Sequence, residues 1–301
     1  MTVLFPKSVE EAVAALAEPD VQVLAGGTDF MVEVNYGHRR PQAVLSLRRM
    51  PQLRHWEHLE AAEAGNLGPP REAVRLGARV TYTDFLQPEL ARLLPALAQA
   101  ARTVGSPQIR NAGTIGGNLG TASPAGDTLP VLAALEAVVE VTGPNGQRDV
   151  PIGEFITGPK RNALQPGELI VAVRVPLVRG HQEFRKVGVR NAMVIAVASL
   201  ALVVDTTTRT VRCAMGSVGP VPLRAPEAEA WLAAAIDWDG TGSHPGPDLA
   251  TFGRLAAEAA RPIDDHRGTA AYRRHAVAVL AERCAAAALA TLDGPAQGAA
   301  A

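Results

Sequence analysis

Residues 25–29 read Ala-Gly-Gly-Thr-Asp, and residues 114–118 read Thr-Ile-Gly-Gly-Asn. Glycine lets main-chain N–H groups approach a ligand without an intervening Cβ, and it tolerates a positive φ. Successive amides in such turns bind anions. One segment of this kind indicates a tight bend, whereas two of similar chemistry indicate a diphosphate held from two sides. A dinucleotide cofactor is the leading hypothesis, with ordinary tight turns as the alternative for either segment alone.

Neither segment matches the common phosphate-binding motifs. The chain lacks Gly-x-x-x-x-Gly-Lys-Ser/Thr, which excludes a P-loop. The second segment reads Gly113-x-x-Gly116-Gly117-x-x-Gly120, whereas the dinucleotide fingerprint is Gly-x-Gly-x-x-Gly. That fingerprint also needs a helix that opens on the glycines, and residues 118–124 are too rich in turn formers to predict one. A Rossmann site is therefore not expected.

Length, charge and cysteine usage narrow the class of protein. The 301 residues allow two or three subdomains, and a net charge of −1 gives no basic field for nucleic acid or an anionic membrane. No uninterrupted apolar run reaches the ~20 residues of a spanning helix, and the N-terminus lacks the features of a signal peptide. Cys213 and Cys284 are too few for a four-cysteine metal site, and nothing in the sequence assigns them a role. We expect a cytoplasmic chain without a metal.

Apolar patterns and turn residues predict an α+β chain with mixed sheets. Strands are expected at 21–24, 43–47, 74–78, 138–142, 169–175 and 211–215, and helices at 8–16, 128–135, 226–235, 249–260 and 270–290. Pro95 predicts a break within the helical pattern of residues 90–101. We place domains at 1–176 (subdomains about 1–55 and 56–176) and 177–290, followed by a flexible tail at 291–301.

A polar segment follows the second glycine segment. Residues 118–127 supply an amide, hydroxyls and, at Asp127, a carboxylate. A phosphate would repel that carboxylate, so we expect Asp127 to face donors such as ribose or ribityl hydroxyls. Asp127 could also cap the helix predicted from Thr128, and the two roles are compatible.

Several segments together resemble a known family. They are residues 24–29, 108–118, 122–127, 168–170, 184–186 and 265–274. Their sequences and order are similar to those of the FAD-binding (medium) subunits of molybdenum hydroxylases, the family of carbon monoxide dehydrogenase and xanthine dehydrogenase. The resemblance spans residues 3 to 285, nearly the whole chain. Some relatives carry an inserted cysteine cluster for an iron–sulfur centre, which this chain lacks.

The resemblance implies a fold and a cofactor site. The fold would be α+β, a PCMH or vanillyl-alcohol-oxidase type FAD-binding fold of two subdomains followed by a C-terminal domain like that of CO dehydrogenase flavoproteins. Both glycine segments would hold the FAD pyrophosphate through main-chain amides, and Ile195 would lie against the isoalloxazine ring. The implied FAD-binding residues are Val23, Leu24, Ala25, Gly26, Gly27, Thr28, Asp29, Phe30, Val104, Thr114, Ile115, Gly116, Gly117, Asn118, Ser123, Asp127, Ile170, Lys186 and Ile195.

Three further features have competing interpretations. Lys186 matches a lysine near the flavin, where a cation would stabilise the reduced ring, but it could equally be a solvated residue at a strand end. The polar residues between Asp264 and Arg274 indicate either a contact surface or, preferably, an N-cap with local ion pairs. Nothing supports His38 as a covalent flavin link, so we expect a dissociable FAD.

The resemblance also implies an activity and partners. This oxidoreductase chain would be the FAD-carrying electron-transfer subunit of a heterotrimer. It would take electrons from the two [2Fe–2S] clusters of a small subunit, while a large subunit carries molybdopterin. A dimer of heterotrimers is expected. The alternatives are a stand-alone FAD-dependent oxidase and a non-catalytic assembly protein of the same fold. Neither the substrate of the molybdenum subunit nor the terminal electron acceptor can be inferred from these motifs.

Overall fold

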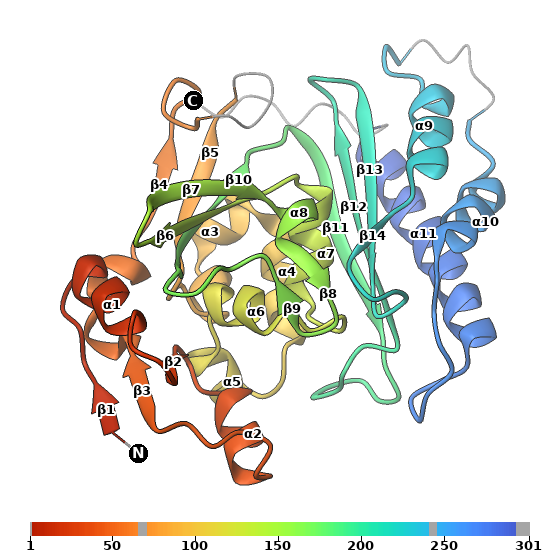
Figure 1. Ribbon diagram of the computed structural model, residues 1–301. Helices are drawn as coiled ribbons and strands as arrows, with labels where there is room; N and C mark the ends of the chain where they lie inside the picture. Colours follow the sequence, from red (N-terminus) through yellow and green to blue (C-terminus); the bar gives the residue numbers. More distant parts are fainter. Residues whose placement is uncertain (1, 66–70, 241–245, 293–301) are drawn as a thin grey trace. The chain divides into compact units, whose positions relative to one another are not determined.

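The computed structural model describes residues 2–65, 71–240 and 246–292 (Figure 1). The chain divides into two compact units. Unit 1 comprises Met1–Leu93, Val104–Ser123 and Glu136–Leu177, and unit 2 comprises Leu94–Thr103, Pro124–Leu135 and Val178–Ala301. The chain thus passes into unit 2 twice before residue 177, which no local pattern in the sequence indicated. Of the tail predicted at 291–301, residues 293–301 lie outside the described residues.

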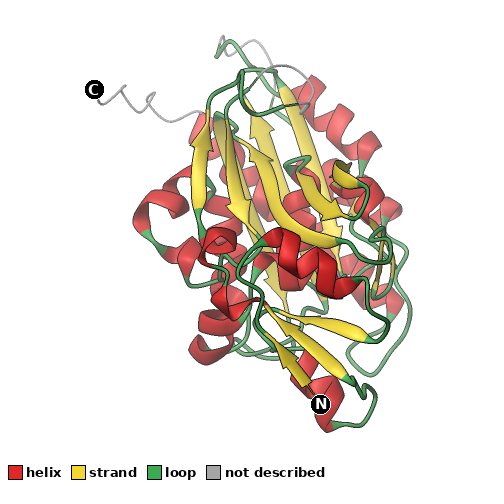
Figure 2. Cartoon of the chain, turned by 60° about the vertical axis from the view of Figure 1, so that its left-hand side comes forward, coloured by secondary structure: helices red, strands yellow, loops and turns green. Residues whose placement is uncertain are grey.

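The N-terminal part of unit 1 contains a small parallel sheet. Its strand order is β1-β3-β2, and Figure 2 shows these short strands next to the N-terminus. A capping interaction starts α1 as expected, because Ser8 Oγ accepts the N–H of Glu11 at 3.2 Å. The elements are β1 (Thr2–Leu4), α1 (Val9–Leu16), β2 (Val21–Leu24), α2 (Phe30–Asn35) and β3 (Ala43–Ser46), then the 3₁₀ helices Leu47–Arg49 and Pro51–Arg54.

The larger sheet of unit 1 is antiparallel, with strand order β4-β5-β10-β6-β7. Strand β10 is buried along its whole length at the centre of the sheet, as its apolar sequence predicts. A two-stranded hairpin, β8-β9, lies in the same unit. The strands are β4 (Trp56–Leu59), β5 (Ala73–Gly77), β6 (Val138–Gly143), β7 (Gly146–Pro151), β8 (Ile156–Gly158), β9 (Arg161–Asn162) and β10 (Leu169–Pro176).

The helices of unit 1 include one that the sequence analysis did not expect. Helix α6 (Ile115–Thr121) opens directly on the second glycine segment, where turn-forming residues had argued against a helix. It forms because Thr114 caps it: Thr114 Oγ1 accepts the N–H of Gly117 at 3.0 Å. The other helices of the unit are the 3₁₀ helix Asp84–Leu86, α3 (Pro88–Leu93), α5 (Pro107–Ala112) and α8 (Ile152–Phe155).

Unit 2 is built on an antiparallel sheet of strand order β11-β12-β13-β14. Helices α4 and α7 pack on one face of this sheet, and α9 and α11 pack on the other. Pro95 begins α4 after α3 has ended, as the predicted break requires. The elements are α4 (Pro95–Thr103), α7 (Thr128–Ala134), β11 (Gly180–Val187), β12 (Ala198–Asp205), β13 (Thr210–Gly216), β14 (Leu223–Arg224), α9 (Pro226–Ala235), α10 (Leu249–Ala259) and α11 (Ala270–Leu292).

Helix α11 satisfies, by length and composition, the criteria for a membrane-crossing helix. The sequence analysis had found no apolar run of that length. The helix packs against α10, β11 and β12, and Ala276, Leu280, Ala281 and Ala285 are buried in the core of unit 2. These contacts are typical of a core helix in a folded domain.

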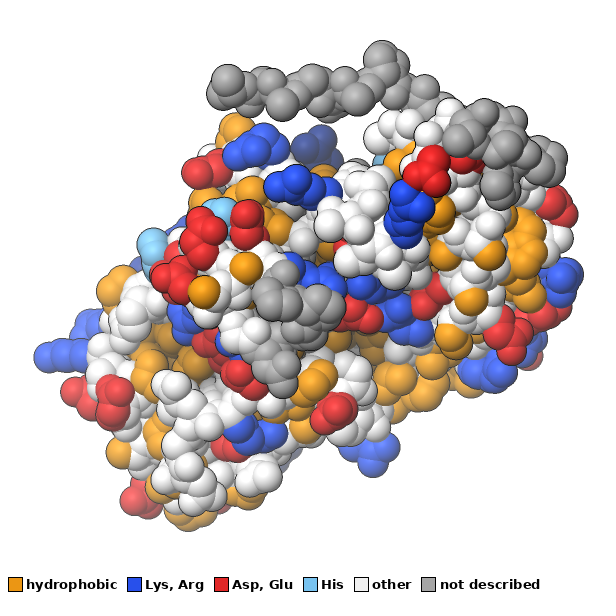
Figure 3. Space-filling view, turned by 90° about the horizontal axis from the view of Figure 1, so that it is seen from above, with side chains coloured by type: hydrophobic (Ala, Val, Ile, Leu, Met, Phe, Trp, Pro, Cys, Tyr) orange, Lys and Arg blue, Asp and Glu red, His pale blue; other side chains and the backbone are white. Residues whose placement is uncertain are grey.

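Neither the cysteines nor the charged side chains of the described residues form a cluster that could bind a metal ion. Cys213 and Cys284 are free thiols in the core of unit 2, and burial raises the pKa of both. Within the described residues, no group of three or more His, Cys, Asp or Glu side chains could hold a metal ion. On the face drawn in Figure 3, acidic and basic side chains are interspersed, which fits the nearly neutral net charge.

Candidate functional site

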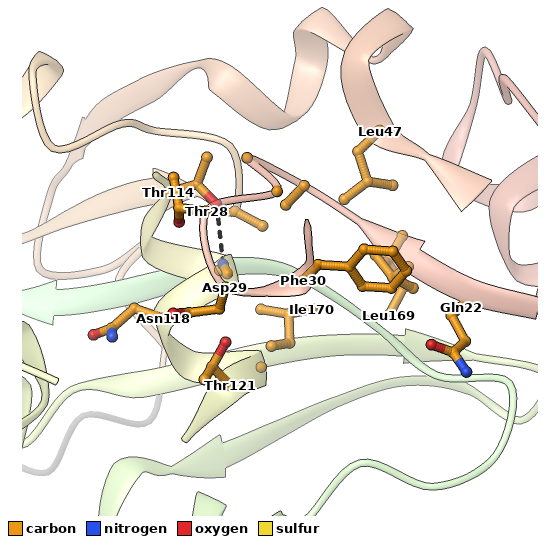
Figure 4. A pocket seen from close by; sticks show the side chains of 18 of the residues that line it. Gln22, Thr28, Asp29, Phe30, Leu47, Thr114, Asn118, Thr121, Leu169 and Ile170 are labelled. Carbon is orange, nitrogen blue, oxygen red and sulfur yellow. Dashed lines mark hydrogen bonds between the residues drawn. The ribbon is translucent and has the colours of Figure 1, made fainter. Parts of the chain in front are cut away.

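The two glycine segments line one pocket in unit 1. Its volume of ≈ 360 Å³ lies within the range of about 300–1,000 Å³ for small-molecule sites. Figure 4 shows Thr28 next to Thr114 and Asp29 next to Asn118, with Thr121, Phe30 and Ile170 also lining the pocket. The lining residues are Gln22, Val23, Ala25, Gly26, Gly27, Thr28, Asp29, Phe30, Glu33, Arg39, Leu47, Ala78, Tyr82, Thr114, Gly116, Gly117, Asn118, Gly120, Thr121, Lys160, Leu164, Glu168, Leu169 and Ile170.

The glycine segments touch each other through their backbones. A Cβ at Gly26 would collide with the carbonyl group of Ala112 and would lie 3.0 Å from Gly113 Cα. Only glycine permits this approach. Segments separated by more than eighty residues are therefore held side by side, which is the arrangement that a shared diphosphate site requires.

The first segment presents free donors. It follows directly on β2, and Gly27 turns the chain with φ +76°, a conformation that favours glycine. The main-chain N–H groups of Gly26, Gly27 and Thr28 have no acceptor among the described residues. Three successive unpaired amides form a concavity suited to an anion.

The second segment differs from the expectation, because its amides are already bonded within the protein. The N–H of Ile115 donates to Val80 O at 2.9 Å, and the N–H of Gly116 donates to Ala78 O at 2.9 Å. The amides of Gly117 and Asn118 donate to the side chain and the carbonyl of Thr114, respectively. The second segment can thus shape the pocket but offers no unbonded amide from Ile115 to Asn118.

The glycines of α6 serve different purposes. A Cβ at Gly116 would lie 2.6 Å from Ala78 O, so packing alone requires this glycine. At Gly120 the nearest atom to an added Cβ would be Ile170 Cδ1 at 3.9 Å, and both residues line the pocket. A helical glycine costs about 1 kcal/mol relative to alanine. Because protein packing does not require it, Gly120 is explained best by a ligand that needs the space.

One acidic side chain at the pocket forms ion pairs with two basic side chains. Glu33 of α2 accepts from Lys160 at 2.7 Å and from Arg39 at 2.9 Å. Hydrogen bonding to Lys160, followed by the charge of Arg39, holds the pKa of Glu33 below its usual value. The Arg39 guanidinium also lies 5.2 Å from the centre of the Phe30 ring. The sequence analysis did not single out these three charged residues, since no local motif brings residues 33 and 160 together.

Most of the predicted residues of unit 1 lie at this pocket, but some do not. Leu24, Val104, Ile115 and Ser123 are absent from its lining. Ile115 is fully buried in the protein core. Conversely, Gly120, Thr121 and Leu169 line the pocket although they were not selected. The glycine spacing at 113–120 and the match at 168–170 were the signals that could have identified them.

The predicted residues of unit 2 include a buried ion pair. Lys186 Nζ donates to Asp127 Oδ2 at 2.6 Å and to the carbonyl of Thr103 at 3.0 Å, and both side chains are 7% exposed. Burial raises the pKa of Asp127, and the ammonium group of Lys186 opposes that effect. Asp127 Oδ1 is buried with no partner among the described residues. A buried carboxylate oxygen normally accepts a hydrogen bond, so this atom points to a donor from outside the described chain.

This pair corrects two interpretations. Asp127 makes no side-chain capping bond to α7, so the capping role is wrong. Lys186 is buried, which excludes a solvated residue at a strand end. Ile195, the remaining predicted residue of unit 2, is 53% exposed on the loop between β11 and β12.

Comparison with known proteins matches both parts of the chain. Residues 1–178 match the FAD binding domain in molybdopterin dehydrogenase, and residues 182–288 match the CO dehydrogenase flavoprotein C-terminal domain. The chain belongs to the FAD-binding subunits of the molybdopterin dehydrogenases. It therefore contains an FAD-binding domain and belongs with the subunits of oxidoreductases, as the motifs in its sequence predicted.

Individual members of this FAD-subunit family align over much or nearly all of the chain. The nicotinate dehydrogenase FAD-subunit of Eubacterium barkeri is 33% identical over 76% of this chain and 78% of its own length. The glyceraldehyde dehydrogenase medium chain of Sulfolobus acidocaldarius is 30% identical over 91% of this chain and 93% of its own. A solved carbon monoxide dehydrogenase of Hydrogenophaga pseudoflava gives a TM-score of 0.83 at 30% identity, covering 97% of this chain and 98% of that one.

Proposed function

We propose that this chain is the FAD-carrying electron-transfer subunit of a heterotrimeric molybdenum hydroxylase. The observation that carries the proposal is the pocket of unit 1, where free amides of one glycine segment face the glycines of another. Family membership supports FAD as the occupant. The features of the pocket fit a diphosphate: unpaired N–H donors, space above a helix, and cations at its edge.

Different residues of unit 1 would donate hydrogen bonds to the cofactor, leave space for it and exclude water from it. The N–H groups of Gly26, Gly27 and Thr28 would donate to the diphosphate, because they have no acceptor in the part of the chain that the structure describes. Gly117 and Gly120 would leave room for it. Phe30, Leu169 and Ile170 would exclude water from the bound cofactor.

The resemblance to the FAD-binding subunits implies cofactor contacts for residues of unit 2 as well. Asp127 Oδ1 would accept a hydrogen bond from a ribityl or ribose hydroxyl. This bond would give the buried oxygen the donor that it lacks among the described residues. Lys186 would keep that carboxylate ionised and oriented through the 2.6 Å contact to Oδ2. Ile195 would offer an apolar surface to the flavin ring.

Bound FAD supplies the ability to collect electrons singly and deliver them in pairs. The chain would receive electrons from a small subunit with [2Fe–2S] clusters, and a large molybdopterin subunit would oxidise the substrate. No side chain of this chain would act as acid or base on that substrate. A dimer of heterotrimers in the cytoplasm and a non-covalent FAD complete the proposal.

A titration of the purified apoprotein tests FAD binding. We expect one FAD per chain, the absorption bands of a protein-bound flavin, and release of free FAD on mild denaturation. Colour retained by the denatured polypeptide would contradict non-covalent binding. A colourless protein that cannot be reconstituted would instead support a non-catalytic assembly protein.

Affinity purification of the tagged chain from its native host tests the partners. We expect two further polypeptides, with molybdenum and iron detected by metal analysis. Turnover of an alcohol or amine by the isolated chain, without partners, would favour a stand-alone oxidase and contradict the proposal.

A further inference from the structure

Arg273, in the first turn of α11, connects three segments of unit 2. Its side chain is only 4% exposed. Nη2 donates to Asp265 Oδ1 at 2.6 Å, while Nη1 donates to the carbonyl oxygens of Val197 at 2.9 Å and Ser217 at 2.6 Å. A buried guanidinium is tolerated only with such partners. The sequence analysis foresaw a local ion pair here but not the two distant carbonyl groups.

The carboxylate partner is itself fixed. Asp265 Oδ1 also accepts the main-chain N–H groups of Arg267 at 2.8 Å and Gly268 at 3.3 Å, which closes a tight turn. The bond from Arg267, together with Arg273, lowers the pKa of Asp265 to about 2. Asp265 is therefore ionised at neutral pH and orients the guanidinium.

The Val197 carbonyl lies at the base of the loop that carries Ile195. The N–H of Val197 donates to Val187 O at 2.8 Å, so the loop begins and ends at this point. The loop itself, residues 188–197, has no helix or strand. Val189, Met193 and Ile195 are all exposed on it. The bond from Arg273 thus fixes the end of the loop two residues after Ile195.

The Ser217 carbonyl belongs to a turn with unusual geometry. Ser217 has φ +62°, which L-residues rarely adopt. Its N–H donates to Pro124 O at 2.8 Å, and its C=O accepts from Arg273. Pro124 is three residues before Asp127. One guanidinium therefore holds the turn against the segment that carries the Asp127 carboxylate.

We infer that Arg273 is a positioning residue for the proposed FAD-binding residues of unit 2, Asp127 and Ile195. It sets the Ile195 loop and, through Ser217, the Asp127 segment, with Asp265 as its orienting partner. The inference rests on the proposed function, because it assigns the cofactor to Asp127 and Ile195. Asp265 and Arg273, both within residues 265–274, would therefore help to arrange the cofactor-binding residues.

Hydrogen exchange of the apoprotein tests the positioning without the cofactor. In Arg273→Gln we expect the amides of residues 125–127, 188–197 and 216–218 to exchange about tenfold faster, equivalent to the loss of one charged hydrogen bond. The matched control is Arg224→Gln, which removes a guanidinium bonded to Glu229 at 2.6 Å and to the Ala133 carbonyl at 3.4 Å in the same unit. The control should leave exchange in those three segments unchanged.

FAD titration and the flavin absorption spectrum form the second part of the test. Arg273→Gln should raise the dissociation constant about tenfold and shift the visible bands of bound flavin, whereas Arg224→Gln should change neither. Arg273→Lys, which keeps the charge but not the fork of donors, should fall between wild type and Arg273→Gln. If Arg273→Gln fails to fold, the milder Asp265→Asn should show the same shifts in smaller size.

The two proposals fail in different ways. Wild-type protein that binds no FAD would overturn the proposed function, and this inference with it. Wild-type protein that binds FAD, combined with an Arg273→Gln variant whose affinity, spectrum and exchange match those of Arg224→Gln, would overturn the positioning role alone.

Discussion

Gly120 lies within a helix, where alanine would be more stable, and it lines the pocket; outside its own helix, no atom of the described residues is closer to an added Cβ than 3.9 Å. We expect Gly120→Ala to raise the free energy of unfolding of the apoprotein by about 1 kcal/mol. The same variant should weaken FAD binding about tenfold, because the new methyl group occupies space needed by the cofactor. Chemical denaturation and a fluorescence titration measure the two effects.

Gly116→Ala is the matched control on the same helix. Its Cβ would lie 2.6 Å from Ala78 O, so this variant should destabilise the apoprotein. If Gly116→Ala lowers the free energy of unfolding and Gly120→Ala raises it, then packing within the protein requires glycine only at position 116. Unchanged FAD affinity in Gly120→Ala would show that the space above α6 is not used.

Both side chains of the ion pair between Lys186 and Asp127 are buried, so the loss of either one leaves an uncompensated buried charge. We expect Lys186→Met to lower the free energy of unfolding by about 3–5 kcal/mol. The double variant Lys186→Met/Asp127→Leu should recover part of that loss, because no charge remains buried. Urea denaturation of the wild type, both single variants and the double variant gives the coupling free energy between the two side chains. Additive losses would show that the two side chains act independently.

Helix α11 is connected to the turn before it by the bond between Arg273 and Asp265. Because the pKa of Asp265 is about 2 in the folded protein and about 3.9 in an unfolded chain, its contribution to stability is present above pH ~4. The contribution is lost as the pH falls towards ~2. The gap in melting temperature between wild type and Asp265→Asn should therefore narrow as the pH falls from about 4 to about 2. A gap that stays constant over this range would contradict the assignment.

Helix α2 is connected to the turn between β8 and β9 by the ion pair of Glu33 with Lys160. Glu33→Gln would free both Lys160 and Arg39 at the edge of the pocket. We expect FAD to bind roughly threefold tighter at low ionic strength, with no difference at high salt. Titrations at two salt concentrations measure this effect. Weaker binding at both would show instead that the ion pair holds α2 in place for the cofactor.

Helices and strands with strong local patterns could be predicted from the sequence. The helices predicted at 226–235 and 270–290 and the strand predicted at 169–175 agree with α9, α11 and β10 to within two residues at each end. Helix α6 could not be predicted, because its stability depends on the Thr114 cap and on packing against Ala78, which overcome the low helix propensity of its glycines.

The site was predictable only where a local motif carried it. The glycine segments were recognised because glycine has a strong conformational signature. The pairing of Lys186 with Asp127, the contact of Glu33 with Lys160, and the bonds of Arg273 to the carbonyl groups of Val197 and Ser217 join residues 56 or more positions apart. Such contacts depend on how the chain folds back on itself, and no periodicity in the sequence records them.

The FAD-loaded protein, solved by crystallography, tests the central claim most directly. We predict that the diphosphate lies in the pocket of unit 1, within hydrogen-bond distance of the N–H groups of Gly26, Gly27 and Thr28 and directly against Gly117 and Gly120. A map that places the diphosphate elsewhere, with those three N–H groups bonded only to water, would contradict the account.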